Sequence, residues 1–250
     1  MTVRIRHAGR TDRGRVRAHN EDAWVADPQQ GLYVVADGMG GEFAGALAAK
    51  VVVETLPSLL RQKMAGIEDF ARPGAATPLL AALAELSHRL RQETEHQPGL
   101  AGMGATVVLA LIRGAQALVA HLGDSRAYLL RGGGLERLTR DHSLVQLLLD
   151  GGEITPAEAA THSARGQLTR NVGMAGEPLP EARVLALSPG DRLLLCTDGL
   201  TGMLSDAELP ALAGPNQGPE ETCARLVQAA NEAGGKDNVT VVVMDVVEEP

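Results

Sequence analysis

The sequence contains few aromatic residues and only two cysteines. Aromatic residues make up 2 % of the 250 residues, so a surface that stacks nucleobases on aromatic rings is not expected. Cys196 and Cys223 lie far apart in the chain, which indicates neither a disulfide framework nor a cysteine-based metal site. We expect both cysteines to be reduced, packed thiols, and the core to consist of Ala, Val, Leu and Ile.

The chain also lacks a long hydrophobic run and an excess of positive charge. Its longest apolar runs, such as Val107–Ile112, are far shorter than the roughly 18 residues that a membrane span needs. No apolar segment follows the arginines of the first ten residues, as a signal peptide would require. With 23 Lys and Arg against 31 Asp and Glu, the net charge is −8. These features predict a cytoplasmic protein that binds neither a membrane nor nucleic acid.

What the sequence does contain is typical of a folded globular protein. It is 44 % hydrophobic and 22 % charged and carries no stretch that resembles an interdomain linker, so we expect one domain, residues 1–250. The predicted strands are Thr2–His7, Gly31–Ala36, Gly104–Ile112, Ala115–Leu122, Ala127–Leu130, Ala182–Leu187, Arg192–Cys196 and Val239–Val247. The predicted helices are Glu42–Arg61, Pro78–His96, Ser143–Asp150, Asp206–Ala213 and Pro219–Glu232.

The central strands are predicted to form an antiparallel meander covered by helices. Arg113-Gly114 separates two of these strands, and Gly123-Asp124 leads into a third; such short connections join antiparallel neighbours. We expect Gly66–Pro78 to be a surface loop between helices and Gly151–Gly166 to be a mobile segment beside the sheet.

Four aspartates share one sequence context, at the rim of an apolar strand. Asp37, Asp124 and Asp198 each have a neighbouring Gly, and Asp237 has a neighbouring Asn; both residue types permit a sharp turn or a close backbone approach. A fifth acidic spot, Glu21-Asp22, lies just before an apolar segment. The strands are therefore predicted to deliver their acidic residues to one edge of a sheet.

A single Asp-Gly pair usually caps a turn, but five acidic spots gathered together favour a metal site. Their mutual repulsion and desolvation require compensation by cations. Carboxylates, with the Gly38 carbonyl, suit Mg²⁺ or Mn²⁺ better than Zn²⁺, and two ions sharing an aspartate would produce a hydroxide nucleophile near neutral pH. A nucleotide-binding reading of the loop Asp37–Gly41 fails, because Phe43 stands where G-x-G-x-x-G needs its last Gly and no G-K-[ST] follows.

Eight short motifs follow one another along almost the whole chain. They are Gly14–Asp22, Val35–Gly41, Gly102–Thr106, Gly123–Tyr128, Leu138–His142, Leu168–Gly173, Cys196–Leu200 and Lys236–Thr240. In this order they resemble the motifs of the PP2C-type (PPM) metal-dependent serine/threonine protein phosphatases in their compact bacterial form. The resemblance implies an α+β fold, a four-layer α-β-β-α sandwich of two antiparallel sheets flanked by helices, with a binuclear metal site at one end.

The resemblance also implies which residues hold the metals. Asp37 would bridge two Mn²⁺ or Mg²⁺ ions, Gly38 would offer its carbonyl to one of them, and Asp198 and Asp237 would hold the other. Asp124 would share a third, weakly bound ion with Asp198. Asp37 and Asp198 are therefore expected to be catalytic.

Further residues are expected around these ligands. Glu21, Asp22 and Asn238 would stand at or just behind the ligands and orient water. Arg17 would be catalytic by gripping the substrate phosphate, because its planar guanidinium fits two phosphate oxygens. His162 lies in the segment Gly151–Gly166, which corresponds to a flap beside the family's active site, and is a candidate for contact with substrate.

The function implied is hydrolysis of phosphoserine and phosphothreonine in proteins by a metal-bridging hydroxide, without a covalent intermediate. Met39 follows the Asp-Gly of the second motif, where many eukaryotic members have a His that could serve as general acid, so metal-bound water is expected to protonate the leaving oxygen. The alternatives are a catalytically silent module that recognises phosphoproteins, or a phosphatase of anti-sigma-factor antagonists. The expected partners are phosphorylated proteins and an opposing Ser/Thr kinase, and the expected state is a monomer.

Several other polar residues are expected to be structural. His121 lies inside a predicted strand and is expected to be a packed core histidine. Asp141, just before His142, is expected to cap the following helix. Ser125 and Ser143 are expected to cap turns, because no nucleophile elbow G-x-S-x-G is present.

Overall fold

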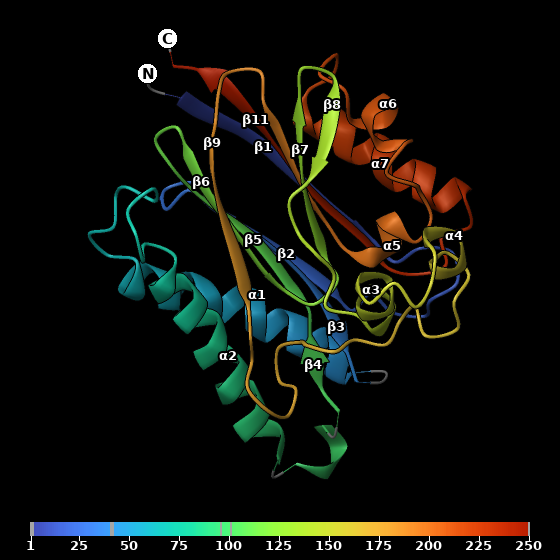
Figure 1. The fold of residues 1–250 in the computed structure, drawn as a ribbon. Coiled ribbons are helices and arrows are strands. Elements are labelled where there is room, and N and C mark those ends of the chain that lie inside the picture. The colour runs from blue at the N-terminus through green and yellow to red at the C-terminus, as the bar shows by residue number, and fades with distance from the viewer. Residues whose placement is uncertain (1–2, 41–42, 96, 101, 250) are drawn as a thin grey trace.

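Two antiparallel β-sheets lie face to face at the centre of the computed structural model, which describes residues 3–40, 43–95, 97–100 and 102–249 (Figure 1). One sheet has the strand order β1 (Val3–Asp12), β11 (Val239–Glu248), β10 (Arg192–Cys196), β7 (Arg126–Arg131) and β8 (Gly134–Arg137). The other has the order β2 (Asp22–Asp27), β3 (Leu32–Met39), β5 (Val107–Arg113), β6 (Gln116–Leu122) and β9 (Glu181–Ala186), and the short β4 (Gly104–Ala105) pairs with β3. Because β1 pairs with β11, both ends of the chain lie side by side (Figure 1).

Helices cover the outer face of each sheet, as predicted. The long helices α1 (Ala44–Lys63) and α2 (Thr77–Glu95) pack on the sheet that contains β3. The other sheet is covered by α5 (Asp198–Thr201), α6 (Leu209–Ala213) and α7 (Pro219–Glu232). Two short helices, α3 (Leu144–Asp150) and α4 (Pro156–Ala159), lie beside α5, and a 3₁₀ turn, η1 (Pro98–Leu100), follows α2 (Figure 1). The α+β four-layer sandwich is thereby confirmed.

The central strands β3, β5, β6, β10 and β11 are almost continuously apolar because both of their faces are covered. In β3, Val34 and Ala36 pack against α1 and α2, whereas Tyr33 and Val35 pack between the two sheets. Side chains of a strand alternate between its two faces, and a strand covered on both sides needs apolar residues at every position. The same alternation in β11 divides its valines between the inter-sheet core and the layer under α7.

The predicted meander is only half present. Strands β5 and β6 pair antiparallel, as expected, but β7 belongs to the other sheet, where it pairs with β10 and β8. The connection at Gly123 has φ 124°, and a Cβ there would lie 2.5 Å from the Cβ of Thr106. This turn carries the chain from one sheet to the other, and sequence alone does not distinguish it from a hairpin turn within one sheet.

Other boundaries differ from the sequence prediction in small ways. The predicted strand Gly104–Ile112 is divided into β4 and β5, and the sequence did not predict β2, η1, β8, α4 or α5. Gly66–Pro78 does connect α1 to α2. The predicted boundaries at Thr2, Glu42 and His96 lie outside the described residues. None of the helices in the described ranges combines the length and hydropathy that a bilayer crossing demands.

A buried arginine joins the sheet of β10 to the loops around α7. Arg192 is 4 % exposed, and its guanidinium donates to both Asp245 carboxylate oxygens at 2.6 and 3.0 Å. The remaining N–H groups donate to the hydroxyl of Thr222 and to backbone carbonyls of residues 213, 214 and 217. The charge is fully partnered, so its burial is tolerated.

Replacing Arg192 with Ala should lower the free energy of unfolding by about 3–5 kcal/mol, because Asp245 would keep its charge in a largely buried place without a partner. Urea unfolding followed by circular dichroism measures the change. Arg4→Ala, at an exposed position of β1, is the matched control and should cost less than about 0.5 kcal/mol. Equal unfolding midpoints for the two variants would contradict this role of Arg192.

Candidate active site

Four aspartates meet in one cavity at the end of the sandwich, but they come from both sheets and not from one sheet edge as predicted. Asp37 lies near the end of β3, Asp124 follows β6, Asp198 follows β10 and opens α5, and Asp237 precedes β11. All four line a single cavity of about 490 Å³ together with Glu21. The two sheets thus contribute acidic groups to the same place from strands that are far apart in the sequence.

Two glycines next to these aspartates let the backbone segments approach closely. A Cβ on Gly38 would lie 1.9 Å from the carbonyl oxygen of Gly45, and a Cβ on Gly199 would lie 1.8 Å from that of Asn238. The Gly38 N–H also donates to the Glu21 carbonyl at 3.1 Å. Any side chain at position 38 or 199 would therefore push apart the segments that carry the carboxylates.

Asn238 ties the N-terminal loop to the acidic cluster. Its Oδ1 accepts from the Glu21 N–H at 2.8 Å, and its Nδ2 donates to the carbonyls of Arg13 and His19 at 2.9 and 2.8 Å. Asn238 is buried, so these bonds hold the loop that precedes Glu21 against the residue after Asp237.

Asp22 is held by two threonines that the sequence analysis did not single out. Its Oδ2 accepts from the hydroxyls of Thr197 and Thr240 at 3.0 and 2.7 Å. Both threonines are fully buried and come from strand ends in the other sheet. Thr197 adjoins Asp198 and Thr240 lies two residues after Asn238 in the sequence, and this closeness to predicted site residues is a signal that could have found them. Only the packing of the two sheets shows that their hydroxyls face Asp22.

Two carboxylate oxygens of this cluster lack partners. Within the described residues, Glu21 Oε1 and Asp22 Oδ1 are buried and accept no hydrogen bond. Burial, followed by the charges of Asp198 and Asp237, raises the pKa of Asp22 to about 7. Burial and neighbouring carboxylates also raise the pKa values of Asp37, Asp124 and Asp198 above the ordinary range. Orphaned carboxylate oxygens and mutual repulsion between carboxylates suit a site that holds hard divalent cations.

Arg17 lies at the mouth of the cavity. Its side chain is about half exposed, and Nη2 donates to Asp237 Oδ2 at 2.6 Å. This hydrogen bond is the main cause that raises the pKa of Arg17. The guanidinium is therefore cationic, next to the carboxylates, and accessible from solvent.

His162 does not line this cavity. Its Nδ1 accepts from the Ala164 N–H at 3.1 Å within the segment after α4. The residues of that segment and its continuation that do line the cavity are Gly166 and Leu168. Contact between His162 and a substrate stays a prediction.

Of the three residues expected to act as caps, Ser143 does so, whereas Asp141 and Ser125 have other partners. Ser143 caps α3 and accepts from the Gln146 N–H at 3.2 Å, so the prediction that Asp141 is the cap is wrong. Asp141 instead accepts hydrogen bonds from the guanidinium groups of Arg126 and Arg137. Ser125 does not cap a turn: its buried hydroxyl bonds that of Thr106 at 2.6 Å, while the Thr106 N–H donates to the Asp37 carbonyl at 2.8 Å.

Comparison with known proteins agrees with this geometry. Residues 11–239 match the family model described as protein phosphatase 2C. The chain is 41 % identical to the serine/threonine protein phosphatase PstP of Mycobacterium tuberculosis over 99 % of its own length, and spans 46 % of that protein. It is 36 % identical to the serine/threonine phosphatase stp of Listeria innocua, with 94 % of each chain covered.

A solved structure extends the comparison to three dimensions. The catalytic domain of PstP, determined with two manganese ions, superimposes with a TM-score of 0.84 at 38 % identity and covers 99 % of this chain and 100 % of that one. The match in sequence and in fold extends over nearly every element that surrounds the acidic cavity. The chain belongs to the protein phosphatase 2C family.

Proposed function

We propose that this protein hydrolyses phosphoserine and phosphothreonine in other proteins and depends on Mn²⁺ or Mg²⁺. The observation that carries the proposal is the single cavity in which four aspartates and Glu21 converge beside Arg17. Carboxylates that repel one another need divalent cations, and an exposed guanidinium beside them suits a phosphate dianion. Membership in the protein phosphatase 2C family and similarity to named Ser/Thr phosphatases support this substrate class.

The residues present fit two divalent cations, with room for a third. Asp37 and the Gly38 carbonyl would hold one ion, Asp37 with Asp198 and Asp237 would hold the second, and Asp124 with Asp198 would hold a weaker third. When bound, such ions neutralise the carboxylates, polarise the phosphoryl oxygens and make water nucleophilic near neutral pH. The orphaned oxygens of the cluster and the structure of PstP with two manganese ions support this assignment.

The chain's own residues bind and orient the reactants. Arg17 would grip the phosphate in its planar fork, a contact already made with the bound substrate. Glu21 Oε1 and Asp22 Oδ1 have no partner among the described residues, so each could accept a hydrogen bond from water and help to orient it. Asn238 holds Glu21 through the backbone bond described above.

No side-chain acid stands beside the Asp-Gly of β3. The residue there is Met39, whose sulfur accepts from Asn171 Nδ2 at 3.3 Å. Protonation of the leaving serine or threonine oxygen is therefore assigned to water. A module that binds phosphoproteins without turnover would require a lost ligand, and every proposed ligand is present.

The chemistry implies a class of partner. A phosphoserine or phosphothreonine must be supplied by a protein Ser/Thr kinase, which this enzyme would oppose. Two buried free cysteines support a reducing, cytoplasmic location. Phe43 and Leu47 lie one turn apart at the start of α1, and the other large exposed apolar side chains lie singly on other elements; this small apolar exposure supports a monomer. The pairing of β1 with β11 supports one domain over residues 1–250.

The direct test is hydrolysis of a phosphothreonine peptide and of para-nitrophenyl phosphate with Mn²⁺, with Mg²⁺ and with EDTA. Turnover that requires the metal is expected with both substrates. If the protein binds Mn²⁺ but hydrolyses neither, the proposal gives way to a phosphoprotein-binding module.

Asp198→Asn and Asp237→Asn should each reduce kcat by more than about 100-fold, because each removes an anionic ligand from the cation site. The fold should persist, since each change also relieves repulsion among the carboxylates. Steady-state kinetics and circular dichroism measure the two effects. Asp69→Asn, in the loop between α1 and α2, is the control and should retain activity; full activity in both site variants would rule out this assignment.

Arg17→Ala should raise KM for phosphate esters by about 10-fold or more and change kcat less, because a charge-assisted contact made in the ground state is lost. Initial rates over a range of phosphopeptide concentrations separate the two constants. Arg10→Ala, an exposed position on β1, serves as the control. An unchanged KM would place the phosphate grip on another residue.

Without metal, the protein should lose stability as pH rises. Asp22 has a folded pKa of about 7 against an ordinary value of 3.8, so the folded state keeps a proton that the unfolded state releases. The free energy of unfolding should therefore fall from about pH 4 to about pH 7 and stay low above it. Melting temperatures in EDTA measure this. Asp22→Asn should make the dependence shallower without removing it, because Asp37, Asp124 and Asp198 also have raised pKa values, and added Mn²⁺ should raise the melting temperature most at high pH. Equal slopes for wild type and Asp22→Asn would contradict the raised pKa.

A further inference from the structure

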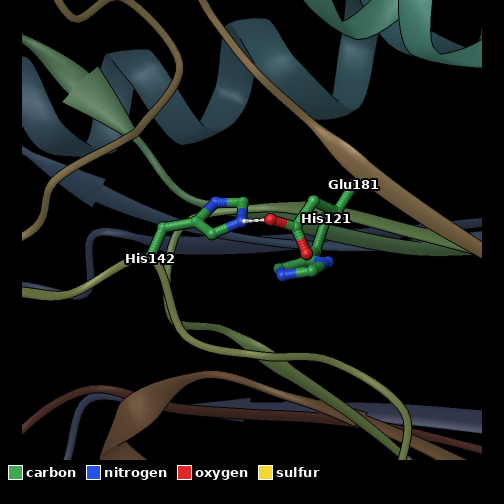
Figure 2. A group of neighbouring side chains, drawn as sticks. All are labelled: His121, His142 and Glu181. Carbon is green, nitrogen blue, oxygen red and sulfur yellow. Dashed lines mark ion pairs between the residues drawn. The ribbon is translucent and has the colours of Figure 1, made fainter. Parts of the chain in front are cut away.

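Two histidines and a glutamate form a compact cluster outside the acidic cavity. His121 of β6, His142 before α3 and Glu181 of β9 offer ligand atoms within 4.8 Å of one another (Figure 2). The two imidazole rings stack with centroids 4.5 Å apart, and His142 Nε2 lies 3.3 Å from Glu181 Oε1. By residue type alone, this trio could hold a transition metal ion.

The hydrogen bonds of the cluster argue against a metal. His121 Nε2 lies 2.8 Å from the Arg140 carbonyl, which can only accept, so this nitrogen carries the hydrogen. His142 Nδ1 accepts from the Gly123 N–H at 3.1 Å, so in the neutral ring the hydrogen is on Nε2, the nitrogen that faces Glu181. Arg170 Nη1 donates to Glu181 at 2.9 Å and also lies 3.3 Å from His142 Nε2. Because Nδ1 is the acceptor nitrogen of the ring, this second approach brings two donors together and is not a hydrogen bond. The Arg170 guanidinium already neutralises the Glu181 carboxylate. Both ring nitrogens of His142 are engaged, so the ring has no free lone pair to offer a metal ion.

The same bonds attach His142 to the turn that carries Asp124. The His142 backbone N–H donates to the Gly123 carbonyl at 3.0 Å, and the Gly123 N–H donates back to the ring. Gly123, with its positive φ, has no side chain through which neighbouring elements could hold the turn. His142 is 4 % exposed, so water does not compete for these bonds.

His142 is also attached to the segment that borders the active site. Its carbonyl accepts from the Thr169 N–H at 2.8 Å, and the next bonded pair joins the Leu144 N–H to the Gln167 carbonyl at 2.9 Å. Gly166 and Leu168, which line the acidic cavity, flank this attachment. The buried residue His142 therefore contacts three parts of the structure. These are Gly123, the segment around Thr169 next to the lining of the acidic cavity and, through Nε2, the Glu181–Arg170 pair.

We propose that His142 is a positioning residue whose ring Nδ1 orients the Gly123–Asp124 turn so that the Asp124 carboxylate reaches the cation site. Glu181 and Arg170 hold the ring in the required tautomer and orientation, as a carboxylate does for a metal-ligating histidine. The proposal rests on the proposed function, because it takes Asp124 as the ligand of the weakly bound cation.

Two substitutions of the same residue separate the two ring nitrogens. In His142→Asn, the side-chain oxygen can lie near the position of Nδ1 and still accept from Gly123; in His142→Gln, the amide can lie near Nε2 and still donate to Glu181, but the acceptor for Gly123 is lost. Mn²⁺ binding is titrated by the electron paramagnetic resonance signal of the free ion, which requires no turnover. Asp124→Asn provides the reference for loss of the ligand itself.

His142→Gln should weaken the weakest Mn²⁺ binding step by about 10-fold or more, as Asp124→Asn does, whereas His142→Asn should stay within about 2-fold of wild type. Because each variant loses one ring hydrogen bond, their melting temperatures should fall by similar amounts. Equal weakening in both variants, or wild-type binding in both, would overturn the proposal. A wild type that binds no Mn²⁺ would instead overturn the proposed function.

A second measurement needs no variant and covers the case in which His142→Gln does not fold. The ¹⁵N chemical shifts of the imidazole nitrogens in the wild-type protein identify which nitrogen carries the hydrogen. A bare Nδ1 and a protonated Nε2 in His142 are expected. The opposite tautomer would exclude the bond from Gly123 and refute the proposal.

Discussion

Repulsion among buried carboxylates is the constraint on which this end of the molecule depends. Five acidic groups share one cavity, and their burial raises the pKa values of Asp37, Asp124 and Asp198. Such an arrangement is unfavourable for the isolated fold and is useful only if cations bind there. The architecture must therefore hold the carboxylates together against their own repulsion.

The sandwich provides that rigidity through its core. Both faces of each sheet are covered by apolar side chains, so the strand that carries Asp37, the strand that precedes Asp198 and the strand that follows Asp237 cannot shift independently. Glycines at positions 38 and 199 then allow backbone contact. Thr197, Thr240 and Asn238 supply hydrogen bonds across the gap between sheets. Close packing and hydrogen bonds to uncharged side chains thus hold together carboxylates that their mutual repulsion would otherwise drive apart.

Much of the site could be predicted because each acidic residue has a local signature. An apolar strand followed by Asp-Gly or preceded by Asp-Asn places a carboxylate at a strand end, and strands of one sandwich share their ends. Turns at glycine were less informative. Gly123 reads as a hairpin residue, yet the strand that follows it lies in the other sheet, because that strand pairs with β10, which comes more than 60 residues later in the sequence. Asp141 likewise reads as a helix cap, but two arginines brought in by β7 and β8 take its carboxylate.

The sequence by itself determined the family, the covered sheets and the identity of the acidic residues, because motif order, apolar runs and Asp-Gly pairs are local properties of the chain. Only the tertiary structure decided which groups meet. It placed Thr197 and Thr240 on Asp22, Arg17 on Asp237 and the ring of His142 under Gly123. These contacts join residues separated by 19 to 220 positions in the chain, and the energy of such contacts depends on distances that only the packing of the two sheets sets.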